Sequence, residues 1–224
     1  MLPIQDTHPS SRFPVWTVVI ILVNIYVFYL ELTSPIPDDF ILQYSLIPNQ
    51  VTPQNLNSLL PFITSQFLHG GFLHIISNML FLWVFGNNIE RTFGAFFFPL
   101  FYLASGVAAG FTQYFITPTS SIPMLGASGA VAGVLGAYFA LFPNNKIKTL
   151  VFIFIFVTVL NVPAYLLLFF WFITQFFNGV ASISLNPNVG GIAFLPHIGG
   201  FLFGWFIALV LFSKRIVARL KFLG

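Results

Sequence analysis

The chain has 224 residues, of which 58% are hydrophobic and only 6% are charged, and its formal net charge is +3. A water-soluble domain of this length carries far more charge, and several segments reach the roughly 18–20 apolar residues that cross a bilayer core. Cysteine is absent, which excludes disulfide bonds, thiolate metal ligands and a thiol nucleophile. The sequence therefore predicts an all-α polytopic membrane protein.

The chain begins with a short polar segment, residues 1–12, which we expect in the cytoplasm. The first predicted span, 13–32, is longer than the apolar core of a signal peptide, so we expect it to remain as an anchor. A long connection follows over residues 33–71. Its apolar stretches at 40–47 and 56–67 are too short and interrupted to span, and we interpret them as short helices in the membrane interface.

Turn residues and breakers divide the rest of the chain into five further predicted spans. These spans are residues 72–86, 94–116, 126–142, 161–177 and 197–212. The apolar run at 150–160 is too short for a span, and we interpret segment 147–160 as an interfacial or re-entrant piece. Residues 178–196 form a predicted loop and residues 214–224 a basic cytoplasmic tail. The membrane domain is thus expected over residues 13–213.

The positions of the charged residues test this count of six spans. With a cytoplasmic N-terminus, all eight Lys and Arg residues lie on the inner side, whereas Glu31, Asp38 and Asp39 lie on the outer side. This is the distribution that the positive-inside rule predicts. A seventh span at 150–160 would place the basic tail outside. We therefore expect six transmembrane helices with both termini in the cytoplasm.

Most of the membrane-embedded side chains that are capable of acid–base chemistry fall at one depth in this topology. They stand near the outer ends of spans two, four and six: His69, His74, Asn78, Ser128 and His197. A single histidine in such a place is usually an interfacial residue that hydrogen-bonds to the backbone. A charge at the bilayer centre costs roughly 2.5–3.5 kcal/mol, however, so a whole set at one depth indicates a functional site.

Two rows of small residues indicate which helices touch. Glycines recur in span four at spacings of three and four, and span six carries a GxxxG pair on the same face as its histidine. The row residues are Gly126, Gly129, Gly133 and Gly136 in span four, and Gly200, Gly204 and Ala208 in span six. Small residues let two helix backbones approach closely. This approach would bring the Ser128 hydroxyl within reach of His197.

Nucleophilic catalysis requires a nucleophile, a base and donors for the oxyanion. Ser128 is the candidate nucleophile and His197 the candidate base. No acidic residue is placed to orient His197, so a dyad is predicted instead of a triad. The nucleophile elbow of soluble hydrolases is excluded, because Ala130 stands where that motif requires glycine. Backbone N–H groups at the start of span four are expected to stabilise the oxyanion.

The two histidines near the start of the second span are assigned different roles. His74 and Asn78 are four residues apart and share one helix face, from which their side chains can donate to the oxyanion. His69 precedes Gly70 and Gly71, so we expect it in the connection above the helix. There it would hold the long outer loop in place.

These motifs, in their order along the chain, resemble those of the rhomboid intramembrane serine proteases. They are His69-x4-His74-x3-Asn78, Gly126-x-Ser128-Gly129 and His197-x2-Gly200-x3-Gly204, within residues 68–212. The resemblance implies the six-helix rhomboid fold, with Ser128 as nucleophile and His197 as base. It also implies an oxyanion hole formed by His74, Asn78 and the Ser128 amide. Glu90 resembles a family glutamate that ties helix ends together after span two.

By the same resemblance, loop 178–196 would cap the site, and the fifth span around Trp171 would border the entry route of a substrate helix. The chain departs from the family pattern at two positions. Ala132 replaces an aromatic residue that supports the histidine ring in some members, and Pro196 stands where a small residue commonly precedes the base. The first departure would loosen His197, while the second suits the start of a helix. Neither removes a catalytic group.

The expected function is therefore that of an intramembrane serine endopeptidase acting on single-span membrane proteins. It requires no cofactor and no metal, and its partners are the substrate helix and the lipid bilayer, without nucleic acid. The expected location is a bacterial plasma membrane. The physiological substrate and the oligomeric state are left open by the sequence.

Three other classes of protein are less consistent with the sequence. A catalytically silent rhomboid-like binding protein would be favoured by loss of Ser128 or His197, and both are present. A small-solute transporter is expected to show inverted repeats and charged or broken helices at the midplane, and the sequence shows neither a repeat nor an acidic midplane residue. A zinc protease using His69, His74 and His197 would lack the glutamate of the HExxH motif.

Overall fold

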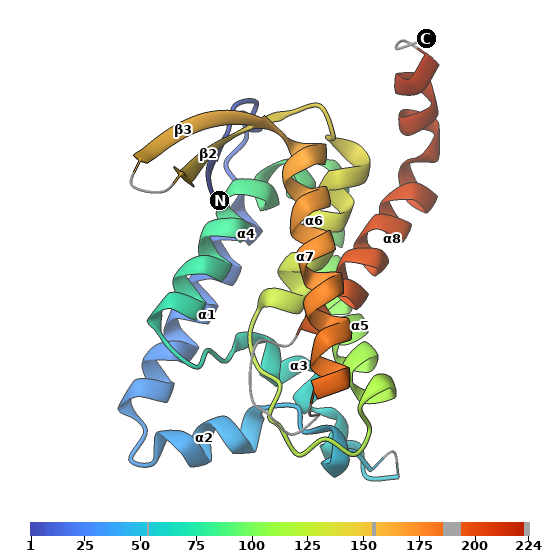
Figure 1. The fold of residues 1–224 in the computed structure, drawn as a ribbon. Coiled ribbons are helices and arrows are strands. Elements are labelled where there is room, and N and C mark those ends of the chain that lie inside the picture. The colour runs from blue at the N-terminus through green and yellow to red at the C-terminus, as the bar shows by residue number, and fades with distance from the viewer. Residues whose placement is uncertain (53, 154–155, 186–193, 222–224) are drawn as a thin grey trace.

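Six long helices form a bundle in the computed structural model, which describes residues 1–52, 54–153, 156–185 and 194–221 (Figure 1). The bundle helices are α1 (Val15–Thr33), α4 (Phe72–Phe93), α5 (Phe97–Ile116), α6 (Ser128–Leu141), α7 (Ala164–Leu185) and α8 (Phe194–Lys221). They correspond one to one with the six predicted spans. The protein is thus mostly helical, with the bundle of long helices that the sequence predicts.

The helices differ in how far they can reach across a bilayer. Four of them, α1, α4, α7 and the Phe194–Ser213 part of α8, contain stretches long and apolar enough to cross a membrane. Helix α6 has 14 residues. At 1.5 Å per residue it is about 21 Å long, shorter than the roughly 30 Å hydrocarbon core. The basic residues Lys146 and Lys148 soon follow its C-terminal end, so we expect its N-terminal residue, Ser128, below the opposite membrane surface.

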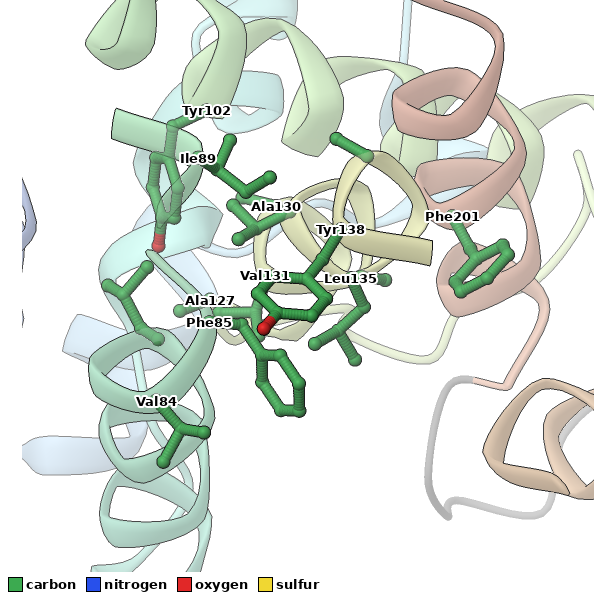
Figure 2. Packing of buried hydrophobic residues seen from close by; sticks show 14 of the residues in the cluster. Val84, Phe85, Ile89, Tyr102, Ala127, Ala130, Val131, Leu135, Tyr138 and Phe201 are labelled. Carbon is green, nitrogen blue, oxygen red and sulfur yellow. The ribbon is translucent and has the colours of Figure 1, made fainter. Parts of the chain in front are cut away.

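Helix α6 is the centre of the bundle. Every residue from 129 to 138 is buried, as expected of a helix that is apolar on all sides. Its side chains Val131, Leu135 and Tyr138 pack in one cluster with Phe85 of α4 and Phe201 of α8 (Figure 2). The rings of Phe85 and Tyr138 meet edge to face, with centroids 4.9 Å apart. Helix α6, which begins with Ser128, is thus packed against neighbouring helices along its length.

A three-stranded antiparallel sheet lies at the end of the bundle where α8 ends (Figure 1). Its strands, in spatial order, are β1 (Leu2–Asp6), β2 (Lys146–Ile153) and β3 (Phe156–Pro163). Segment 147–160 is not a span, as the sequence predicts, and most of it forms the hairpin β2–β3; its interfacial position stays a prediction. Its β-branched residues favour a strand, and the N-terminal segment supplies the partner β1.

Short helices occupy the opposite end of the molecule, between α1 and α4 (Figure 1). They are α2 (Pro37–Tyr44), η1 (Pro48–Gln50), η2 (Leu56–Leu59), α3 (Pro61–Thr64) and η3 (Ser65–Phe67), where η denotes a 3-10 helix. The short helices predicted near 40–47 and 56–67 are thus present. Helix α2 begins with Pro37, a residue that suits the first helical turn because it has no N–H to satisfy.

Several helix boundaries extend beyond the predicted ones. Helix α4 continues past the predicted end at residue 86, and α8 continues into the predicted tail as far as Lys221, with non-helical dihedral angles at Phe212. The prediction of a loop over 178–196 is wrong at both ends, because α7 runs to Leu185 and α8 begins at Phe194. Asn178 and Gly179 favour a loop locally, but they lie within α7. Residues 186–193 of the predicted loop lie outside the described residues.

Glu90 joins two helices, although it lies within α4 and not in a loop after it. Its carboxylate accepts hydrogen bonds of 2.9 Å from the backbone N–H groups of Trp16 and Thr17, and a third from the Thr17 hydroxyl at 2.8 Å. These N–H groups belong to the first turn of α1, which has no intrahelical acceptor for them and favours a negative charge. The carboxylate thereby fixes the start of α1 against α4.

Candidate active site

Ser128 is the first residue of α6. Gly126, two residues earlier, has a φ of +120°, a conformation that favours glycine, and its N–H donates to the carbonyl oxygen of Ser65 at 2.8 Å. The turn before α6 is thus fixed by a backbone hydrogen bond. The first N–H groups of a helix have no intrahelical acceptor, so the hydroxyl of Ser128 stands at a helix end where backbone N–H groups and the helix dipole favour a negative charge.

His197 brings its imidazole to this serine from α8. Its Nε2 atom lies 2.8 Å from Oγ of Ser128, within hydrogen-bond distance. The histidine is buried, with 7% of its surface exposed. The two residues are 69 positions apart in the chain, so their contact depends on how α8 packs against α6.

Glycines permit this packing, as the sequence pattern indicates. A Cβ atom at Gly200 would collide with the carbonyl oxygen of Gly129, and one at Gly204 would collide with the carbonyl oxygen of Gly133. The backbones of α6 and α8 are therefore in direct contact. Gly126 departs from the predicted row, because the space beside its Cα faces His74 of α4 and not α8.

His74 and Asn78 reach the same space from α4. A Cβ atom at Gly126 would lie 2.7 Å from Nε2 of His74 and 3.6 Å from Oγ of Ser128, so both groups face one point. Asn78 is buried, and its Nδ2 atom has no hydrogen-bond partner among the described residues. Both side chains line the same cavity as Ser128, and they lie four residues apart on one face of α4, as the sequence predicts.

His69 lies apart from this group, in the turn before α4. Its side chain is 1% exposed, and its ring meets the ring of His74 edge to face at a centroid distance of 5.1 Å. Burial, with a smaller contribution from the neighbouring His74, lowers the pKa of His69 from 6.5 to about 3. The ring is therefore neutral at physiological pH, and it does not line the cavity described next.

A cavity of about 730 Å³ contains the candidate residues. Polar side chains gather on part of its wall: His74, Ser77, Asn78, Ser128, Gln175 and His197. The rest of its lining is mostly apolar, with Leu73, Phe81, Leu135 and Trp171 among the residues. A mostly apolar cavity with a few convergent polar groups is typical of a binding site. Within the part of the chain that the structure describes, no three His, Asp or Glu side chains are placed to hold a metal ion.

Two residues of α7 contact His197 in ways that the sequence analysis missed. Oε1 of Gln175 lies 2.7 Å from Nδ1 of His197. The ring of Trp171 lies against the imidazole, with centroids 5.9 Å apart and planes at 33°. An aromatic side chain therefore supports the histidine despite Ala132, but it comes from α7 and not from α6. The available signal was a glutamine within an apolar helix, because polar groups in such segments are costly and often functional.

Comparisons with known proteins identify relatives of this chain. A family model described as the rhomboid domain matches residues 56–214. Rhomboid protein 1, mitochondrial, of Saccharomyces cerevisiae is 31% identical over 71% of this chain and 45% of its own length. RHOMBOID-like protein 5 of Arabidopsis thaliana is 32% identical over 68% of this chain and 44% of its own length. Rhomboid protease GluP of Bacillus subtilis is 30% identical over 70% of this chain and 28% of its own length. The chain aligns with less than half the length of each of these curated relatives.

Proposed function

Because this chain belongs to the rhomboid family, we propose that it is an intramembrane serine protease that cleaves transmembrane segments of single-span membrane proteins. The observation that carries the proposal is the 2.8 Å contact between Oγ of Ser128 and Nε2 of His197. This contact stands at the wall of a cavity, so a peptide can reach it. A protein that only binds client helices does not require a serine and a histidine in hydrogen-bond contact.

The dyad supplies the nucleophile and the base. Oγ of Ser128 attacks the carbonyl carbon of the scissile peptide bond while Nε2 of His197 takes the hydroxyl proton. The protonated His197 then gives this proton to the leaving amine. A water molecule, activated by the same nitrogen, hydrolyses the acyl-enzyme and releases Ser128. No cofactor enters any of these steps.

The oxyanion of the tetrahedral intermediate forms next to three groups of donors. They are the backbone N–H of Ser128, the ring of His74 and the side-chain amide of Asn78. The start of α6 adds the positive end of a helix dipole. Donors held in place before the reaction stabilise the developing charge without reorganisation. The unpaired Nδ2 of the buried Asn78 supports this role, because a buried donor usually has an acceptor.

The shape and chemistry of the cavity support an apolar peptide as substrate. Its lining is mostly apolar, with polar groups confined to the neighbourhood of Ser128. An extended stretch of a partner's transmembrane segment, unwound near a small residue, fits these walls better than a polar peptide does. The physiological substrates are therefore proposed to be single-span proteins whose helices unwind easily.

The protein is an integral multi-pass membrane protein, and we propose that both of its termini face the cytoplasm. Strand β1 and the end of α8 lie at the same end of the bundle, together with Lys146 and Lys148 of β2 (Figure 1). A tag at either terminus is expected to resist protease added outside intact cells, whereas a cleavage site inserted near Asp38 of α2 is cut. Termini on opposite sides would exclude this topology. The named relatives include mitochondrial and bacterial proteins, so they do not favour the expected bacterial plasma membrane.

Incubation of the purified protein with a model single-span substrate tests the proposed activity. Ser128→Ala and His197→Ala are each expected to abolish cleavage while the protein stays folded. Ser105→Ala is the matched control, because this buried hydroxyl only donates to the carbonyl oxygen of Phe101 in its own helix. Turnover in purified Ser128→Ala protein would exclude the mechanism. Binding of the substrate without cleavage, and without labelling of Ser128 by a fluorophosphonate, would indicate the silent binding protein instead.

A further inference from the structure

The two ring nitrogens of His197 have different partners. Nε2 faces Oγ of Ser128 at 2.8 Å, and Nδ1 faces Oε1 of Gln175 at 2.7 Å. We propose that Gln175 is a positioning residue, which holds His197 in the tautomer that can accept the proton of Ser128. The inference rests on the proposed function for its catalytic meaning, but the tautomer itself is measurable without activity.

The argument begins with the donors and acceptors of the two side chains. A neutral imidazole carries one N–H and one bare nitrogen, and an amide oxygen only accepts. A hydrogen bond between Nδ1 of His197 and Oε1 of Gln175 therefore requires the proton on Nδ1. Nε2 is then bare and accepts the hydroxyl proton of Ser128. The opposite tautomer would turn Nε2 into a donor and leave it unable to act as a base.

The neighbouring threonine fixes which end of the amide faces His197. The hydroxyl of Thr174 donates to the carbonyl oxygen of Trp171 at 2.7 Å, so its proton is already used. Its oxygen is therefore free to accept, and Nε2 of Gln175 donates to it at 3.4 Å. Reversing the amide would place Oε1 next to an oxygen that offers it no proton. The hydrogen bonds thus run in one direction from Ser128 to the backbone of α7.

Trp171 and Gln175 act from one helix face. They are four residues apart on α7, a spacing that places side chains next to each other. Trp171 lies against the imidazole ring, while Gln175 accepts a hydrogen bond from Nδ1 at the edge of the ring. Together they fix both the tilt and the tautomer of the ring. A neutral amide does this without the desolvation cost of a buried carboxylate, which suits a site within a membrane.

Histidine tautomers can be observed directly by NMR of protein labelled with ¹⁵N in its histidine rings. The His197→Ala spectrum identifies the signals of this residue among the four histidines. In the wild-type protein we expect the proton on Nδ1. Gln175→Met has a similar shape but no amide oxygen, and it should allow the Nε2–H tautomer to appear. Gln175→Glu, with its carboxyl group ionised, is acceptor-only and should restore the proton on Nδ1.

Turnover of the model substrate gives a second readout. A net hydrogen bond of about 1.4 kcal/mol corresponds to a tenfold change, so kcat is expected to fall about tenfold in Gln175→Met and to recover in Gln175→Glu. Gln113→Met is the matched control, because Gln113 of α5 also hydrogen-bonds through its side chain, to Thr117, but does not line the cavity. It should leave both kcat and the His197 signals unchanged.

The outcomes separate the two proposals. An unchanged Nδ1–H tautomer in Gln175→Met overturns the positioning role, whatever the activity. Loss of that tautomer in Gln175→Glu overturns it as well, because the acceptor is then shown not to matter. A wild-type protein that shows the Nδ1–H tautomer and its dependence on Gln175, but no cleavage, refutes the proposed function and leaves the positioning role intact.

Discussion

The carboxylate of Glu31 on α1 accepts a hydrogen bond of 2.8 Å from the backbone N–H of His69. This bond ties the turn before α4 to the first helix. The ring of His69 lies edge-on to the rings of Phe28 and His74, and neither of its nitrogens has a partner among the described residues. The backbone of His69 therefore anchors the outer loop, and its side chain contributes packing.

Substitution of His69 separates packing from chemistry. His69→Ala leaves a cavity and is expected to cost about 2 kcal/mol or more of stability, which lowers the melting temperature. His69→Phe fills the same space and removes two unpaired polar atoms, so it should keep or raise the melting temperature. Both variants should retain kcat while folded. Melting and kcat are measured on the same detergent-solubilised samples, and a stable but inactive His69→Phe would assign His69 a chemical role.

The buried His69 also makes stability depend on pH. Because burial lowers its pKa from 6.5 to about 3, the unfolded chain binds a proton between these values that the folded chain does not. Stability therefore falls as the pH is lowered through this range, by at most about 1.4 kcal/mol per pH unit. His69→Phe lacks this contribution. The wild-type melting temperature should thus fall more than that of His69→Phe between about pH 7 and pH 5, and equal slopes would contradict the prediction.

The helices and the contact of Ser128 with His197 could be predicted from the sequence because both depend on local patterns. Runs of apolar residues define spans, and the glycines next to Ser128 and His197 indicate the contact of α6 with α8. The sheet could not be predicted in the same way. Residues 147–160 form a short apolar run that suits a strand or a helix piece equally. Their partner β1 is far away in the chain, and its Asp6 is buried against Tyr138 and Asn88 although it stands in a polar segment.

The contact of Gln175 with His197 was missed for a related reason. It depends on the rotation of α7 relative to α8, which no local pattern determines. A search for carboxylates also directs attention away from a neutral partner. The contact of Trp171 with His197 was missed for the same reason, while its predicted place beside the substrate entry route stays a prediction. Residues that support a catalytic group are less recognisable than the group itself.

Alanine substitution of His74 and Asn78 tests the oxyanion hole. Loss of one oxyanion donor typically lowers kcat by about 10²–10³, and donors that share one oxyanion can compensate for each other. We expect His74→Ala to fall in this range with little change in melting temperature, and Asn78→Ala to lose less activity. Asn87→Ala is the matched control, because Asn87 lies near the other end of α4 and its side-chain amide donates to the carbonyl oxygen of Ser10. Its kcat should match that of the wild type.

The opposite result would be equally informative. If His74→Ala and Asn78→Ala melt at lower temperatures and keep wild-type kcat in the folded fraction, these side chains are structural. The backbone N–H groups at the start of α6 would then stabilise the oxyanion alone. In that case the unpaired Nδ2 of Asn78 would donate to some acceptor other than the oxyanion of the substrate.

Gly204→Ala tests whether the backbone contact of α6 with α8 sets the dyad. The added methyl group would collide with the carbonyl oxygen of Gly133 and lie 2.7 Å from its Cα atom. Neither atom can rotate away, so the two helices must separate, at a cost of about 1–3 kcal/mol. His197 would then move away from Ser128, and a misplacement of about 1 Å can cost a factor of 10² in rate. Both melting temperature and kcat are therefore expected to fall.

A second glycine provides the control for melting. A Cβ atom at Gly70 would find its nearest neighbour, Cδ1 of Leu125, at 3.8 Å, which is an ordinary contact. Gly70→Ala should therefore melt near the wild-type temperature. The difference in melting temperature between Gly204→Ala and Gly70→Ala then reports the steric collision and not the general effect of replacing a glycine. If Gly204→Ala keeps the wild-type melting temperature and kcat, the helices tolerate separation at this point. The distance between Oγ of Ser128 and Nε2 of His197 would then be set by α7, through Trp171 and Gln175, and not by the glycines.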